Sequence, residues 1–129
     1  MASIFSKIIQ GELPGHFVWQ DDICVAIMTI QPINPGHLLL IPRVEVDHWD
    51  DLPADIAAHL MVTGQRLAKA LKQAFPSRRV GLVIAGFEVP HTHLHLIPAN
   101  DLADFDFSGL AFAAADELAA AAERIRRYL

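Results

Sequence analysis

Cysteine is almost absent from this chain: its 129 residues include a single one, Cys24. One thiol cannot close an internal disulfide bond, so the fold does not depend on one. Cys24 lies within the apolar run Ile23–Ile30, and such surroundings favour a buried, inert thiol over a reactive one. We therefore expect no catalytic role for Cys24.

Long hydrophobic runs and clustered basic residues are also missing. No window approaches the length of a membrane span, and the opening segment 1–7 lacks the apolar stretch of a secretory signal. The formal net charge is −5, which argues against binding to a nucleic-acid polymer. We expect a cytoplasmic protein without a membrane partner. The charge does not exclude binding to a small phosphorylated ligand.

What the chain does have is apolar surface, since 53% of its residues are hydrophobic and only 19% are charged. This composition predicts one compact domain. Apolar residues at helical spacing predict helices over 4–9, 53–75 and 113–129. Apolar runs bounded by turns predict strands over 16–19, 23–30, 37–41, 80–85 and 89–98. Helices and strands interleave in an α+β arrangement.

The single domain, residues 1–129, divides into three parts: a core over 1–98, an acidic connector over 99–112 and a C-terminal helix over 113–129. The connector carries two phenylalanines, Phe105 and Phe107. Our preferred interpretation is a solvated connector that these rings pin to the core. The alternative is a flap that faces a substrate.

Three histidines, His91, His93 and His95, alternate with Thr92 and Leu94. Alternate side chains of a β-strand share a face, about 6.6 Å apart along the strand, so we expect the imidazoles to form one row. Each buried imidazole needs polar partners. Packing alone is therefore a poor explanation for three of them.

Two chemistries suit such a row. Two histidines at i and i+2 can share a zinc ion, with a third ligand from His37 or His48. Alternatively, a neutral imidazole can attack phosphorus and form a covalent phosphohistidine, while its neighbours stabilise the phosphoryl oxygens and protonate the leaving group. The residues by themselves leave both chemistries open.

The segment His91-Thr92-His93-Leu94-His95-Leu96-Ile97 resembles the signature of the histidine triad (HIT) family. The segment Pro35–Pro42, with His37, resembles the family's loop and strand that carry a fourth histidine. Segments 4–9, 11–14 and 20–22 resemble the family's opening and its first hairpin turn. These matches follow the family's order and extend over nearly the whole chain.

The resemblance implies a HIT-like fold: a five-stranded antiparallel sheet with a long central helix and a C-terminal helix, usually paired into a dimer. It also implies chemistry at the α-phosphate of a nucleotide, without a cofactor or a catalytic metal. His93 is then the nucleophile that forms a nucleotidyl-histidine intermediate, and His95 lies beside the phosphate and the leaving group. His91 orients the nucleophile through its backbone carbonyl, and His37 completes the polar network.

The resemblance also suggests where a small purine nucleotide binds. Phe5, Ile8, Leu13 and Ile27 fall at positions where the family lines its base pocket with apolar side chains. Thr29 stands where the family commonly has an aspartate that holds the ribose hydroxyls, and a hydroxyl accepts a weaker hydrogen bond than a carboxylate.

The chain departs from the family pattern just before the triad. Residues 84–90 are shorter than usual and lack the amide and hydroxyl side chains that contact the phosphate and the leaving group. Glu88 lies near the position of the missing serine, and strand alternation predicts that it faces away from the histidines. Ser3 and Ser6 replace the cysteines of a zinc site found in some members, so no structural zinc is expected.

The main hypothesis is that the protein hydrolyses a nucleotide through His93. The reaction would be that of a nucleoside phosphoramidase or a related nucleotidyl transfer. Three alternatives stay open: a nucleotide-binding or regulatory module with little turnover, a dinucleoside polyphosphate hydrolase, and a metal-dependent hydrolase with the three histidines as ligands. The helix over 53–75 has more apolar surface than one face of a small sheet requires, which permits a homodimer.

Overall fold

The structure, a computed structural model, describes residues 2–129. Its strands form one antiparallel sheet in the order β1-β2-β3-β5-β4. The α+β fold with a five-stranded antiparallel sheet is confirmed. The elements along the chain are α1 (Ile4–Ile9), β1 (Phe17–Gln20), β2 (Cys24–Met28), β3 (Leu38–Pro42), the 3-10 helix η1 (Trp49–Asp51), α2 (Ala54–Ala74), β4 (Arg79–Val83), β5 (Leu94–Ala99), the 3-10 helix η2 (Leu102–Asp104) and α3 (Ala115–Arg126).

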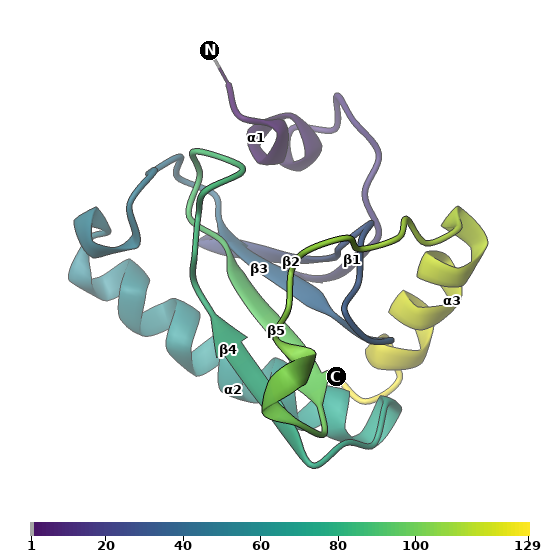
Figure 1. The fold of residues 1–129 in the computed structure, drawn as a ribbon. Helices are drawn as coiled ribbons and strands as arrows, with labels where there is room; N and C mark the ends of the chain where they lie inside the picture. The colour runs from purple at the N-terminus through teal and green to yellow at the C-terminus, as the bar shows by residue number, and fades with distance from the viewer. Residues whose placement is uncertain (1) are drawn as a thin grey trace.

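Helices cover both faces of the sheet: α1 lies on one side, and α2 lies on the other (Figure 1). The alternation of side chains along β2 explains this arrangement. Cys24, Ala26 and Met28 pack into the cluster that includes residues of α2 and α3. Val25 and Ile27 pack into the cluster that includes Phe5 of α1. The central strands are therefore buried on both faces and read as continuous apolar runs in the sequence.

The predicted histidine strand over 89–98 is wrong at its start, because β5 begins only at Leu94. The preceding backbone forms hydrogen bonds elsewhere. The His91 amide donates to the Val89 carbonyl over 2.8 Å, and the Thr92 amide donates to the carbonyl of Val46 over 2.7 Å. Only His95 of the triad therefore lies within the sheet.

The acidic connector crosses the sheet face that carries α1. Two hydrogen bonds fix its far end: Gln31 Nε2 donates to the Leu110 carbonyl over 3.1 Å, and the Ala113 amide donates to the Ile30 carbonyl over 2.9 Å. Phe105 packs directly over Gly81 of β4, as the preferred interpretation of the connector predicts. Within residues 2–129, no helix combines the length and the apolar character needed to cross a membrane.

The contact between Phe105 and Gly81 yields a first prediction. A methyl group added at Gly81 would collide with the Phe105 ring, so Gly81→Ala should lower the free energy of unfolding by about 1–3 kcal/mol. Gly64 in α2 is the matched control, because its added methyl makes only an ordinary contact of 3.7 Å with Leu40 and alanine favours a helix by about 1 kcal/mol. Urea unfolding measures both changes. Changes of the same sign would contradict the prediction.

Candidate active site

A cavity of about 320 Å³ opens on the sheet face that carries α1. Side chains of three neighbouring strands form its floor. In the sheet, Leu39 pairs with Ile27 on one side and with His95 on the other. Its walls come from α1, the loop after it, the ends of β2 and the connector. The lining residues are Ile4, Phe5, Ile8, Pro14, Gly15, Ile27, Met28, Thr29, Ile30, Gln31, His37, Leu39, Glu88, Val89, His93, His95, Phe107 and Leu110.

Most of the residues predicted from the sequence meet in this cavity. The catalytic candidates that line it are His37, His93 and His95, and the nucleotide-binding candidates that line it are Phe5, Ile8, Ile27 and Thr29. Leu13 is not among the lining residues, and its side chain is exposed. Pro14 and Gly15, the next two residues along the chain, contribute to the wall in its place.

His93 is held in one orientation by the backbone. Its Nδ1–H donates to the carbonyl of His91 over 2.7 Å, and the ring packs edge-on against Phe5 with centroids 4.8 Å apart. In a neutral imidazole, a proton on Nδ1 leaves the lone pair on Nε2. His93 therefore presents an unprotonated ring nitrogen beside the cavity, which is what a nucleophile requires.

His37 and His95 form a directed chain of hydrogen bonds. The Ile33 amide donates to His37 Nδ1 over 3.0 Å, so the proton of a neutral His37 sits on Nε2. His37 Nε2 lies 2.9 Å from His95 Nδ1 and donates to it. The proton of a neutral His95 must then sit on Nε2. His95 thus offers a donor next to the lone pair of His93, with ring centroids 5.1 Å apart.

Burial keeps this pair of imidazoles neutral. It lowers the pKa of His37 to about 3, with a further contribution from His95. It also lowers the pKa of His95 to about 4, and His93 lowers it further. Both rings are nearly inaccessible to water, so the charged forms would lose hydration, and the charge of Glu88 offsets that loss only in part at His95.

The expected row of three imidazoles is wrong at His91, which does not line the cavity. Its Nε2–H donates to the Pro42 carbonyl over 2.8 Å, and Ser3 Oγ donates to its Nδ1 over 2.7 Å. Ser6 Oγ and the Ser3 amide both donate to one oxygen of Glu45, over 2.7 and 2.6 Å. These bonds lower the pKa of Glu45 to about 2. His91 therefore positions the carbonyl that binds His93.

This arrangement does not suit a metal ion shared by the triad. Both ring nitrogens of His91 are engaged, and one nitrogen of His95 is occupied by His37. His48, the other candidate for a third ligand, is exposed and lies 3.8 Å from Asp47. Nε2 of His93 and Nε2 of His95 make no hydrogen bond among the described residues, but a metal shared by all three histidines would have to displace a hydrogen bond of His91.

Two residues in the cavity differ from the sequence interpretation. Phe107 does not merely anchor the connector, because its ring packs 4.8 Å from the ring of His95 and 6.3 Å from that of His37. Phe107 therefore faces the cavity, and its contact with a substrate stays a prediction. Glu88 was expected to face away from the histidines, but it lines the cavity with them. The alternation of an extended strand does not reach Glu88, because residues 84–93 form no strand and β5 begins only at Leu94.

Asp21, Cys24 and His59 form a second group of potential ligands, which the sequence interpretation missed. Their ligand atoms lie within 4.8 Å of one another. Burial would raise the pKa of Asp21, but hydrogen bonds from Trp19, Cys24 and His59 outweigh it and hold the pKa well below its usual range. Cys24 is buried as predicted, and burial followed by the charge of Asp21 raises its pKa to about 12. The carboxylate therefore acts as a structural link between the β1–β2 turn and α2.

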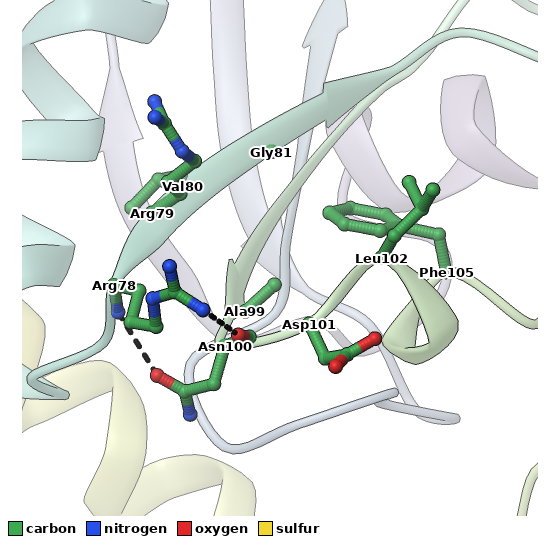
Figure 2. Close-up of a pocket in the computed structure, with 9 residues that line it drawn as sticks. All are labelled: Arg78, Arg79, Val80, Gly81, Ala99, Asn100, Asp101, Leu102 and Phe105. Atoms are coloured by element: carbon green, nitrogen blue, oxygen red, sulfur yellow. Dashed lines mark hydrogen bonds between the residues drawn. The ribbon is translucent and has the colours of Figure 1, made fainter.

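A second cavity, also about 320 Å³, lies between β4 and η2 (Figure 2). At one end the Arg78 amide donates to Asn100 Oδ1 over 2.9 Å, and at the other lies the ring of Phe105. None of the described residues that line it is a histidine or a predicted site residue. The candidate active site is therefore the cavity that holds His93 and His95.

Because His37 and His95 are neutral in the folded protein, we predict that its stability depends on pH. Unfolding returns the pKa of His37 and His95 to about 6.5, so the unfolded chain binds more protons below that pH and the free energy of unfolding falls as the pH falls. Between pH 6 and 4.5 we expect a loss approaching about 1.4 kcal/mol per pH unit for each histidine. Urea unfolding across this range measures it.

Two variants test the assignment of this pH dependence. His37→Gln removes one titrating group and should lower the slope, while His95 and His91, whose burial also lowers its pKa, keep contributing. His48→Gln removes an exposed histidine and should leave the slope unchanged. Equal slopes in both variants would show that the buried pair does not cause the effect.

Comparison with known proteins identifies the family of this chain. A model of the HIT domain matches residues 10–102. An uncharacterized HIT-like protein of Methanocaldococcus jannaschii is 33% identical over 99 residues, which cover 74% of this chain and 77% of that protein. The adenosine 5'-monophosphoramidase of Saccharomyces cerevisiae is 37% identical over 101 residues, which cover 78% of this chain but only 64% of the enzyme.

Solved structures give the same result. A crystal structure of a HIT-like protein from Bartonella henselae matches with a TM-score of 0.88 and 29% sequence identity, and the match covers 98% of this chain and 96% of that one. Among the sequence relatives, an adenylylsulfatase of Arabidopsis thaliana is also 30% identical over 103 residues, which cover 76% of this chain and 52% of the enzyme. The chain belongs to the histidine triad (HIT) family.

Proposed function

We propose that this protein hydrolyses a nucleoside 5'-phosphoramidate, or a closely related nucleotidyl compound, at the α-phosphate, with His93 as the nucleophile. One observation carries the proposal. His93 keeps its Nε2 lone pair free beside the cavity because its Nδ1–H is bound to the His91 carbonyl. The yeast relative, an adenosine 5'-monophosphoramidase, and the Arabidopsis relative, an adenylylsulfatase, both have names that support chemistry at an adenylyl group.

The reaction follows from the two imidazoles that face the cavity. His93 Nε2 bonds to phosphorus while the bond from phosphorus to the leaving nitrogen breaks, and His95 Nε2–H transfers its proton to that nitrogen, which departs as the amine. Water then adds to phosphorus and returns a proton to His95 Nε2, while the bond to His93 breaks. One water is consumed: one proton replaces the proton that His95 gave to the amine, and the hydroxide joins phosphorus, so the products are a nucleoside monophosphate and an amine.

The apolar end of the cavity is suited to the purine base. Phe5, Ile8 and Ile27 form apolar walls on the side of α1, where a base can be removed from water. Thr29 lines the same cavity and takes the ribose in this proposal. Its hydroxyl also accepts a hydrogen bond from the Gln31 amide over 3.3 Å.

Replacing His93 tests the proposal. We expect His93→Ala to lower kcat/KM for an adenosine 5'-phosphoramidate by at least about 10³-fold, because no other unprotonated nitrogen replaces Nε2. Release of AMP, followed by chromatography, is the measurement. His48→Ala, at an exposed histidine, should retain full activity. Unchanged AMP release by the His93 variant would refute the mechanism, and AMP binding without turnover in the parent would favour a regulatory module.

We also propose that the protein is a homodimer. Strand β4 lies at an edge of the sheet, and open strand edges readily pair with another chain. Leu82 on this strand and Met61 and Val62 on α2 are exposed apolar residues. A second copy would cover such residues.

Light scattering coupled to gel filtration tests the dimer. The parent should elute with twice the mass of one chain, and Leu82→Lys should shift the equilibrium toward the monomer by placing a charge at the edge strand. Phe112→Lys is the control, because Phe112 is exposed and its neighbour Ala113 is hydrogen-bonded to Ile30, just after β2, which two strands separate from β4. A parent of monomer mass at high concentration would refute the dimer.

A further inference from the structure

The candidate active site contains a charge arrangement that is unusual for a phosphate-binding cavity. Of the described residues that line it, none is a lysine or an arginine, and one, Glu88, carries a carboxylate. Sites that bind several phosphate groups normally supply cations or dense arrays of backbone amides. A cavity with one fixed negative charge instead repels additional negative charge.

Glu88 lines the same cavity as His93 and His95. Its charge acts on His95 and raises the pKa of that imidazole, against the larger lowering effects of burial and His93. Because the proposed mechanism places the leaving nitrogen beside His95 Nε2, the charge that acts on His95 also acts on the leaving group.

The local backbone explains why Glu88 turns inward. Gly86 adopts φ +82°, a conformation that side chains rarely permit. The next residue, Phe87, is 95% exposed, and the chain then returns toward the cavity, where Glu88 and Val89 both line the wall. Glu88 itself stays exposed to solvent, so its carboxylate needs no buried counterion.

We propose that Glu88 selects the leaving group, so that the site prefers phosphoramidates whose leaving amine carries a positive charge and discriminates against leaving groups with negative charge. This inference rests on the proposed function. Every nucleotidyl substrate has the same α-phosphate, so the repulsion between Glu88 and that phosphate is common to all of them. Selectivity is a difference of free energies, and only the charge of the leaving group differs.

Three matched adenosine 5'-phosphoramidates test the proposal: those of 1,5-diaminopentane, pentylamine and 5-aminopentanoate, whose distal ends are cationic, neutral and anionic. We expect kcat/KM to decrease in that order. The first and last should differ by about tenfold, which suits a solvent-exposed charge. Added salt should reduce the difference because it screens exposed charges. Equal values for the three substrates would refute the proposal.

Variants assign the preference to one residue. Glu88→Gln should bring the three values together, and Glu88→Lys should reverse their order. Glu117→Gln, at an exposed carboxylate on α3, is the matched control and should preserve the parent order. A preference that survives in Glu88→Lys would overturn the assignment. If the parent releases AMP from none of the three substrates, the proposed function fails, and this inference fails with it.

Discussion

The hydrogen bond between His93 Nδ1 and the carbonyl of His91 is the interaction on which the candidate site depends. This contact of 2.7 Å determines which nitrogen of His93 keeps its lone pair. The carbonyl stays in place because the His91 ring is bound at both nitrogens, to Pro42 and to Ser3. Helix α1 supports the same imidazole from a second direction, since the Phe5 ring packs against His93.

Neutrality of the other two histidines in the cavity follows from the way the sheet buries them. His95 lies on β5 beside Leu39 of β3, so apolar strand surface continues directly up to its ring. A charged His37 would carry a proton at Nδ1 and could no longer accept the hydrogen bond from Ile33. The direction of the whole chain of hydrogen bonds therefore depends on the same desolvation that lowers both pKa values.

Apolar periodicity predicts the individual strands and helices, whereas the five-stranded sheet and most of the cavity residues are predicted from the resemblance to the HIT family. Residues two apart in an extended chain share a face, and His93 and His95 share the cavity as that rule predicts. The orientation of Glu88 could not be predicted, since the prediction assumed an extended strand from residue 89, whereas β5 begins only at Leu94 and the Thr92 amide bonds to Val46 outside the sheet. The contact between Phe107 and His95 depends on the path of the connector, which contacts as distant in sequence as Gln31 and Leu110 determine.

The network behind His93 combines hydroxyl, carboxylate, imidazole and peptide groups. It extends from Glu45 through Ser6 and Ser3 to His91. Serine hydroxyls, unlike cysteine thiolates, do not pass through sulfenic or disulfide states and do not exchange bound metal. The bonds that orient His93 therefore include no thiolate that an oxidant or a loss of zinc could alter.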